Sequence, residues 1–282
     1  MGLFSGLENL GLGKVKKMDL YQSDETPVKG TESKPEVKHE ITEAEILFEK
    51  TYTCPVCDHQ FKVKTVRTGK VKLLAADTDL RPRYQGVDSL KYDAIVCPKC
   101  GYGALNRFFN YMTSAQAKLI KEQISRGFKG LPKEGEIYTY DDAILRHKIA
   151  LANSVVKKSK TSERAYTCLK LGWVIRGKIE TLPADVAKRE EVLKELKSEE
   201  EECIYNAYEG FKQAFSKESF PMCGMDETTM TYLTAELARR CGYFDDASRW
   251  IAQILTSKTA SERIKSKARE IKDLIRAEKE NL

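Results

Sequence analysis

The chain has 282 residues, of which 41% are hydrophobic and 32% are charged, and its net charge is +6 at pH 7. These proportions are typical of a globular protein that buries a substantial core, and they exclude a small fold that depends on disulfides. No apolar stretch is long enough to span a bilayer, and no secretory signal is recognisable. We therefore expect a cytoplasmic protein without a transmembrane segment.

Residues 1–40 differ in composition from the rest of the chain. Residues 1–19 form a short apolar segment that glycines interrupt. Residues 20–40 are polar, contain Pro27 and Pro35, and show no apolar period, so they bury too little surface to order themselves. The sequence predicts an N-terminal apolar peptide on a flexible linker, and the role of this peptide stays open.

Four of the eight cysteines occur in two Cys-Pro-x-Cys pairs. A tetrahedral metal site needs four soft ligands that converge from two directions, and each tight turn of this kind delivers two thiolates. Gly101 follows the second pair and lets the backbone fold so that amide groups point at the sulfurs. Because four thiolates leave no open coordination position, the ion is structural. The sequence predicts one structural zinc ion on four ligands: Cys54, Cys57, Cys97 and Cys100.

Two other interpretations fit this cysteine pattern less well. A redox centre needs only one such pair, usually beside an alternating strand-helix pattern, which this sequence lacks. Iron accepts the same thiolates, but the gap between the pairs is long for an iron site, so zinc is favoured. We interpret His59 as a neighbour of the site and not as a ligand. The four remaining cysteines show no paired spacing and are interpreted as packing residues: Cys168, Cys203, Cys223 and Cys241.

The segment around the cysteine pairs contains two candidate strands. Phe61, Val63 and Thr65 alternate with polar residues, which is the period of a half-buried strand. A second strand is predicted over residues 92–96, which run directly into the second pair. Strands that end in cysteine turns predict a zinc ribbon in residues 41–112.

The polar segment between the two cysteine pairs is basic and too long for a tight turn. In residues 68–90, acidic and basic side chains cluster around Tyr84. Internal salt bridges explain this cluster better than a ligand-reading loop does, but both interpretations stay open. The basic residues also indicate an anionic partner, but only weakly, because a solvated surface of mixed charge contains as many basic residues without any partner. The candidate anion contacts are Lys62, Lys64, Arg67, Lys72, Arg81 and Arg83.

From residue 113 onward the sequence predicts helices, the first of which starts with a capping box of Thr113 and Gln116. Tyr140 and Phe244 are each followed by Asp-Asp-Ala, and small and bulky residues continue one helix face from there. This pattern resembles the second helix of a tetratricopeptide repeat, although a generic helical bundle uses the same spacings. We predict such repeats in residues 113–282, closed by a C-terminal capping helix. The same spacing recurs at Ala207, Phe211 and Ala214.

The sequence holds little that indicates catalysis. It has only three histidines, and it contains neither a nucleophile elbow nor a phosphate-cradling loop. The acidic pairs Asp141-Asp142 and Asp245-Asp246 lie at predicted helix starts, where the helix dipole favours them without any catalytic role. We therefore expect that this protein is not an enzyme.

Four motifs follow one another along the chain: Cys54-Pro55-Val56-Cys57, Thr78-Asp79-Leu80-Arg81-Pro82 with Tyr84, Tyr92-Asp93, and Cys97-Pro98-Lys99-Cys100-Gly101-Tyr102. The order of these motifs resembles a bacterial family catalogued as domain of unknown function 2225. The opening Gly6-Leu7-Glu8-Asn9-Leu10-Gly11-Leu12 also resembles the start of some clostridial members. The resemblance covers nearly the whole chain, and it implies a bacterial cytosolic protein but no assigned activity.

Together these patterns predict an α+β fold that is mostly α, in which a small zinc-ribbon module is joined to tetratricopeptide-like helices. The favoured function is a non-enzymatic, zinc-binding adaptor, because repeat helices leave one face free for a protein or peptide partner. Nucleic-acid binding through the basic ribbon is the second hypothesis. A zinc-dependent or redox enzyme is the third. The partner's identity and the oligomeric state stay open.

Overall fold

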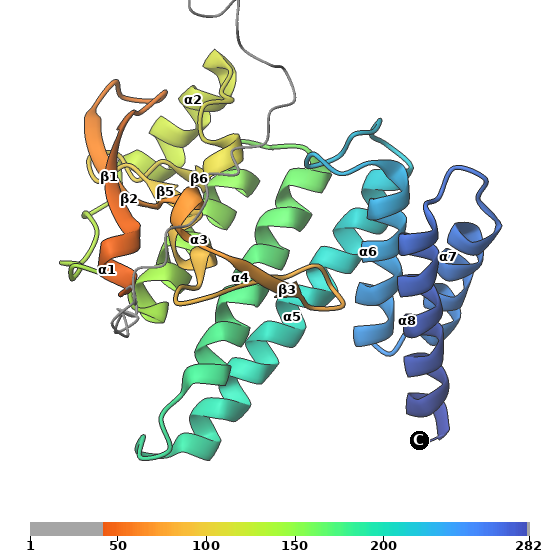
Figure 1. Cartoon of the computed structure of the whole chain (residues 1–282). Coiled ribbons are helices and arrows are strands. Elements are labelled where there is room, and N and C mark those ends of the chain that lie inside the picture. Colours follow the sequence, from red (N-terminus) through yellow and green to blue (C-terminus); the bar gives the residue numbers. More distant parts are fainter. Residues whose placement is uncertain (1–41, 281–282) are drawn as a thin grey trace, which may run out of the picture. The chain divides into compact units, whose positions relative to one another are not determined.

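The strands of the structure form three separate antiparallel pairs, all of them before residue 106. This computed structural model describes residues 42–280, and the predictions for residues 1–40 lie outside the described residues. Figure 1 shows the arrangement. The pairs are β1 (Leu47–Thr53) with β2 (Gln60–Val66), β3 (Leu73–Ala76) with β4 (Pro82–Tyr84), and β5 (Ala94–Val96) with β6 (Gly103–Leu105).

The alternation predicted for the first strand is confirmed in β2. Phe61 and Val63 are buried, while Lys62 between them is exposed. Tyr52 of β1 lies opposite Phe61, so one face of this hairpin is aromatic and apolar. A half-buried antiparallel pair of this kind keeps one face on the core and the other in water.

The second predicted strand begins two residues later than the sequence indicated. Residues Ser89–Tyr92 form a 3₁₀ turn, η4, and β5 begins at Ala94. The physical reason is local: the Asp88 carboxylate accepts a hydrogen bond from the Leu90 amide at 3.1 Å and caps the turn. The residues of β5 are all buried, and β5 and β6 pack against helix α3 (Tyr140–Val156).

After residue 106 the regular elements of the described chain are helical, as predicted. The capping box of Thr113 and Gln116 is confirmed at the start of α2, which continues into a π-helical turn, η6. Two short elements, α1 and η3, flank the first hairpin, and η5 follows β6. The bounds are α1 (Glu43–Ile46), η3 (Thr68–Lys70), η5 (Asn106–Phe108), α2 (Ser114–Ile120), η6 (Lys121–Ser125), α4 (Thr161–Thr181), α5 (Arg189–Phe215), α6 (Glu227–Arg240), α7 (Phe244–Thr256) and α8 (Glu262–Glu280).

Each helix from α3 to α8 packs against the helix before it, and α8 also contacts α6. The charged residues that the sequence places between 184 and 202 extend a long hairpin of α4 and α5. Residues 41–282 form one unit, and independent folding of 41–112 and 113–282 stays a prediction. The tetratricopeptide character of the helix pairs also stays a prediction.

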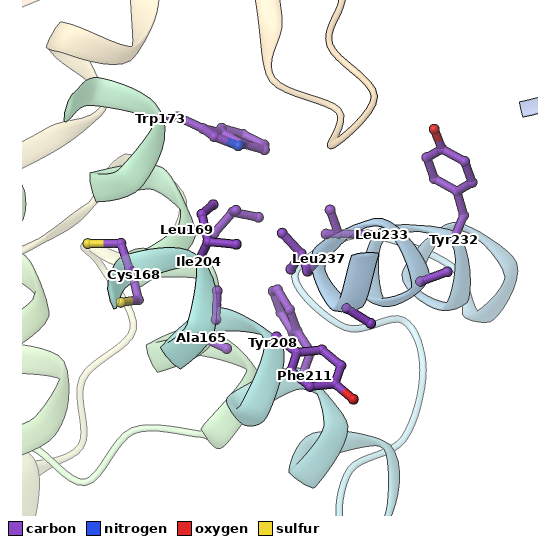
Figure 2. Packing of buried hydrophobic residues seen from close by; sticks show 14 of the residues in the cluster. Ala165, Cys168, Leu169, Trp173, Ile204, Tyr208, Phe211, Tyr232, Leu233 and Leu237 are labelled. Atoms are coloured by element: carbon purple, nitrogen blue, oxygen red, sulfur yellow. The ribbon is translucent and has the colours of Figure 1, made fainter. Parts of the chain in front are cut away.

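The largest core lies between α4, α5 and α6 (Figure 2). Ala207, Phe211 and Ala214 of α5 are fully buried there, on the face that their spacing indicates. Helices α4 and α5 approach so closely at Gly210 that a Cβ there would lie 2.7 Å from the Cβ of Ala165. Glycine at this position therefore permits the close approach. Small residues at such a crossing let the larger side chains around it interdigitate.

The β3–β4 hairpin occupies the segment that the sequence analysis treated as a polar connector. Figure 1 shows it lying across α4 and α5. Leu73 and Leu74 of β3 are 56% and 59% exposed, which is unusual for adjacent leucines. The chain between the two strands contacts the helices, as described below.

Candidate metal centre

The first pair of cysteines lies in the turn that joins β1 to β2. The Cys54 amide donates to the His59 carbonyl at 3.0 Å, and the Asp58 amide donates to the Cys54 carbonyl at 2.9 Å. Asp58 takes a left-handed conformation with φ of 58°, which closes the turn in few residues. The backbone of the hairpin thus brings Cys54 and Cys57 to the same side.

The second pair lies in the matching turn between β5 and β6. The Cys97 amide donates to the Tyr102 carbonyl at 2.8 Å, and the Gly101 amide donates to the Cys97 carbonyl at 3.0 Å. Gly101 has φ of +72°, and a Cβ there would lie 2.5 Å from the ring of Phe128. Both the conformation and the close contact require glycine at this position.

The two turns bring the four sulfurs into one cluster. Sγ of Cys54 lies 3.5 Å from Sγ of Cys100, and Sγ of Cys57 lies 3.7 Å from Sγ of Cys97. All four sulfurs lie within 4.8 Å of one another. Thiolates bound tetrahedrally at about 2.3 Å from a zinc ion are about 3.8 Å apart, so these distances fit one metal ion.

Backbone amides surround the sulfurs, as the sequence analysis expected. Cys54 accepts hydrogen bonds from Val56 and Cys57, and Cys97 accepts them from Lys99 and Cys100. Amides directed at sulfur stabilise the thiolate form that a metal requires. The amide of Tyr102 plays the same part for Cys100.

Within the cluster the pKa of one thiol is lowered and that of another is raised. A bound cation would let both thiols ionise. Hydrogen bonds from Cys100 and Cys54 lower the pKa of Cys97 to about 2. Hydrogen bonds to Cys54 and Cys97 raise the pKa of Cys100 well above its ordinary range. Thiols this close cannot all ionise by themselves, because each thiolate repels the next. A bound divalent cation removes this conflict, so the cluster can hold a metal ion.

The cluster is enclosed by apolar and aromatic side chains. Cys54 and Cys97 are fully buried, and Cys57 is partly exposed. The ring of His59 stacks on Phe61 at 6.2 Å, and His59 is not in the four-cysteine cluster, in agreement with its predicted role. The surrounding residues include Val56, Phe61, Tyr102, Phe109 and Ile120.

A hydrogen bond from α3 connects the second turn to the helices. The Asn153 side-chain amide donates to the Gly101 carbonyl at 3.0 Å and to the Ile149 carbonyl at 2.9 Å. Because Asn153 is fully buried, the geometry of this turn is coupled to the position of α3.

The four other cysteines lie outside the cluster. Cys168 and Cys203 are buried in the helical core, and Cys223 and Cys241 are partly buried. Within residues 42–280 the four ligand candidates form the one group of cysteine, histidine and acidic side chains close enough to hold a metal.

The residues predicted as anion contacts make interactions within the chain. Lys62 pairs with Glu49 at 3.0 Å, and Lys64 donates to the Gly135 carbonyl and lies over the ring of Tyr138. Arg67 stacks on Phe48, while Lys72 is exposed. Contact with an external anion stays a prediction for these residues and for Arg81 and Arg83.

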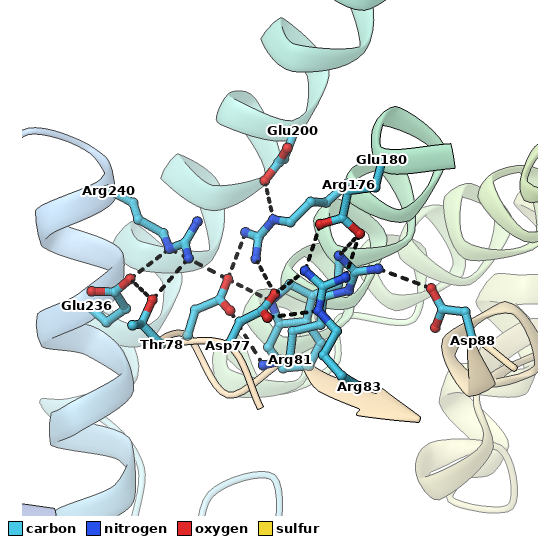
Figure 3. A network of polar contacts seen from close by, with 12 residues as sticks. Asp77, Thr78, Arg81, Arg83, Asp88, Arg176, Glu180, Glu200, Glu236 and Arg240 are labelled. Carbon is cyan, nitrogen blue, oxygen red and sulfur yellow. Dashed lines mark hydrogen bonds and ion pairs between the residues drawn. The ribbon is translucent and has the colours of Figure 1, made fainter. Parts of the chain in front are cut away.

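The chain between β3 and β4 inserts side chains between the helices (Figure 3). Asp79 is fully buried and accepts hydrogen bonds from the Trp173 indole at 3.0 Å and from the Arg176 guanidinium at 2.7 Å, both on α4. The Thr78 hydroxyl donates to the buried Glu236 of α6 at 2.6 Å, and Arg240 donates to Thr78 at 3.1 Å. Asp79 and Thr78 therefore link α4 to α6 through adjacent positions of the chain.

Arg81 and Arg83 complete this network on the other side. Arg81 pairs with Asp88 at 3.1 Å and with Glu180 at 3.0 Å, and its side chain is buried. Arg83 pairs with Asp77 at 2.8 Å, and it shares Glu180 with Arg81. The hydrogen bonds that Arg83 donates to Glu180 and Asp77 raise the pKa of Arg83. For the charged residues of this loop, the structure thus favours internal salt bridges over binding of a ligand.

The helical partners of this network were missed from the sequence. They come from α4, α5 and α6, and no local spacing connects them with residues 77–83. One signal was present: Arg176 and Glu236 interrupt apolar runs, and an ionic residue in such a run needs a buried partner. The missed partners are Trp173, Arg176, Glu180, Glu200, Glu236 and Arg240.

Comparison with known protein families shows to which family the chain belongs. A family model described as "Uncharacterized protein conserved in bacteria (DUF2225)" matches residues 47–275, which include both cysteine pairs and the helices from α2 to most of α8. The chain belongs to this DUF2225 family. No curated protein and no solved structure matches it. The predicted resemblance is therefore confirmed, and DUF2225 membership by itself brings no activity.

None of the helices within residues 42–280 combines the length and the apolar character that crossing a bilayer requires.

Proposed function

We propose that this protein is a non-enzymatic adaptor in which one zinc ion stabilises the ribbon and the helices bind a protein or peptide partner. Zinc is the metal that suits four thiolates in a tetrahedral arrangement. When bound, it would neutralise the thiolates and cross-link the two turns. With all four positions taken by sulfur, no position is left for a substrate or an activated water.

The observation that carries the adaptor proposal is a cleft of about 770 Å³ between α5, the end of α6 and the start of α7. A second hollow of about 540 Å³ continues along α5 and shares Lys197 and Glu201 with the first. The two form a groove along one helix face. A groove suits an extended or helical segment of a partner better than it suits a compact metabolite.

The side chains at the cleft have the character of a binding surface. Tyr205 lines the cleft and is 45% exposed, and the ring of Tyr243, which is 43% exposed, lies 6.5 Å from the Tyr205 ring, next to the lining. Ile204 and Phe244 line the cleft beside them. Exposed tyrosines around an apolar floor are enriched at interfaces, because they offer contact area at low entropic cost.

The charges of the cleft indicate which partner fits. Arg240 and Glu200 already pair with residues of this chain. Lys197 and Glu201 form no ion pair within the described residues, so both are available to a partner. We infer a peptide segment with an apolar or aromatic anchor and flanking charges of both signs.

The cleft can be tested with a double variant, Tyr205→Ala with Tyr243→Ala, in the full-length protein. Partners captured from nuclease-treated bacterial lysate are identified, purified and titrated against wild type and variant. We expect the variant to lose at least about tenfold in affinity, the size of effect that aromatic anchors produce. A photo-crosslinking residue at position 205 should label the same partner.

The matched control replaces Leu73 and Leu74 with serine, which removes two exposed apolar side chains outside the cleft. This control should keep full affinity. If the control loses the partner and the tyrosine variant keeps it, the partner binds at β3 and the cleft assignment is wrong.

Nucleic-acid binding is tested on the same preparations by reversing Lys62, Lys64 and Lys72 to glutamate. We expect no shift of short RNA or DNA at about 150 mM salt, where the Debye length is about 8 Å. Lys62 and Lys64 already make contacts within the chain. A submicromolar shift that the triple variant abolishes would establish the nucleic-acid function instead.

A further inference from the structure

Another cavity, of about 800 Å³, shares no lining residue with the adaptor cleft. Three segments far apart in the sequence form its walls: residues 107–116 after β6, residues 159–163 at the start of α4, and residues 218–224 between α5 and α6. This volume falls in the range of pockets that bind small molecules. None of the residues discussed for metal or partner binding lines it.

Two cations at this cavity have no carboxylate partner. Arg107 and Lys160 form no ion pair within residues 42–280, although both line the cavity. The Arg107 guanidinium lies 5.6 Å from the ring centre of Phe108 and 5.5 Å from that of Tyr166. These rings hold the guanidinium in place while leaving its N–H groups without an acceptor.

The two acidic residues at the cavity are, in contrast, already engaged. Glu163 pairs with the buried Lys157 at 2.7 Å. Glu218 accepts a hydrogen bond from the Ser162 amide at 3.0 Å and another from the Ser162 hydroxyl at 2.5 Å. Lys157 neutralises Glu163, whereas Glu218 keeps its charge because Ser162 is neutral, so Arg107 and Lys160 against Glu218 leave the cavity with a net positive charge.

A strained loop shapes the wall next to Arg107. Cys223 and Gly224 are consecutive residues with positive φ, 49° and 75°, and such strain in a non-glycine residue is often associated with binding sites. A Cβ on Gly224 would lie 2.2 Å from an Arg107 nitrogen, so glycine leaves the space that the guanidinium occupies.

Cys223 itself is not the reactive group of this site. Its thiol donates to the Ser162 carbonyl at 3.3 Å, and burial raises its pKa to about 12. The thiol stays neutral at physiological pH, so it neither attacks a ligand nor repels an anion. The apolar and aromatic part of the lining includes Tyr111, Met112, Pro221 and Met222, and polar side chains complete it: Thr113, Gln116, Ser159, Ser162 and Ser219.

We propose that this cavity binds an organic carboxylate that carries an aromatic or other apolar group. Arg107 and Lys160 hold the carboxylate, and the apolar wall contacts the rest of the molecule. A planar guanidinium with free N–H groups matches a carboxylate in two-point geometry. This chemistry is shared by free aromatic acids and by the C-terminal residue of a peptide. The inference does not depend on the adaptor function.

The test uses three probes with the metal-loaded, full-length protein in titration calorimetry. N-acetyl-L-phenylalanine represents a peptide C-terminus, 3-phenylpropionate represents a free acid, and N-acetyl-L-phenylalaninamide lacks the charge. We expect at least one acid to bind with a dissociation constant of about 1 mM or below and the amide to bind at least about tenfold more weakly. Preference for the first acid would indicate a peptide terminus, and equal binding would indicate free acids.

Two variants separate the ligand role of the cations from a structural one. Lys160→Gln changes an exposed residue and should weaken acid binding several-fold without altering thermal unfolding. Arg107→Gln should weaken it at least about tenfold, while Lys272→Gln, an exposed lysine on α8, should change nothing. Equal affinity for acid and amide, no binding of either acid up to about 10 mM, or unchanged affinity in both cavity variants would overturn the proposal.

Discussion

Replacing Cys97 with serine is expected to release the metal and to unfold the ribbon. The ribbon has only short strands and a small aromatic core around the four cysteines, so metal binding supplies much of its folding free energy. Structural zinc contributes about 10 to 16 kcal/mol in isolated zinc-finger peptides. Serine cannot replace the thiolate, because its hydroxyl stays protonated and is a poor ligand for a soft site.

The helices from α4 to α8 have their own core and should stay folded in this variant. Circular dichroism should therefore retain most of the helical signal, while hydrogen exchange becomes fast in residues 47–66 and 94–105. Cys241→Ser, a change in a partly buried cysteine outside the cluster, is the control and should keep both metal and protection. A Cys97→Ser protein that binds metal and unfolds like the wild type would show that the cluster is not a stabilising metal site.

Replacing Asp79 with alanine should destabilise the protein by about 3 to 5 kcal/mol, because it removes one carboxylate partner of a buried guanidinium and the acceptor of the Trp173 indole. Asp79 accepts hydrogen bonds from Trp173 and Arg176, and Arg240 lies 3.7 Å away. Arg176 keeps contacts with Asp77 and Glu200, so part of its charge stays compensated. Denaturant unfolding gives the free energy directly.

The control for this prediction is Asp141→Ala. Asp141 forms an ion pair with Lys178, but its side chain is 77% exposed. Exposed pairs contribute less than about 1 kcal/mol, so the two variants should differ clearly. Equal effects of the two substitutions would mean that the chain between β3 and β4 does not anchor the ribbon to the helices.

The Asp79 carboxylate should also make the stability of the protein depend on pH. Burial raises the pKa of Asp79, but hydrogen bonding and charge from Arg176, with Arg240, outweigh burial and hold the pKa below its ordinary value. A lowered folded pKa contributes stability above the unfolded value of about 3.9, and this stability is lost as the pH falls through the folded pKa. The stability difference between wild type and Asp79→Asn should therefore be constant near pH 7 and shrink below about pH 4.

The clustering of the four cysteines was predictable because the information for it is local. Each pair of cysteines specifies one turn, and two turns with the same ligand type specify one tetrahedral site. Burial of Phe211 and its neighbours was predictable for a related reason, since an apolar face at helical spacing has few alternatives. These features depend on residues within one or two turns of each other.

The contacts of Asp79 were not predictable, because they depend on how α4 and α6 meet around the β3–β4 hairpin. The sequence showed charged residues in a connector, and the partners of Asp79 on α4 lie more than 90 positions away from it. The late start of β5 has a smaller cause, the capping of η4 by Asp88, which competes with strand formation. The two cavities also arise from packing between distant segments, and no motif marks them.

Elemental analysis of the purified full-length protein, produced in medium that supplies both zinc and iron, tests the central claim most directly. The four cysteine sulfurs lie within 4.8 Å of one another, and a metal ion that binds all four has no open position. The account predicts one zinc ion per chain and no iron, together with loss of that zinc in the Cys97→Ser variant. Protein that contains no zinc, or that contains iron in its place, would contradict it.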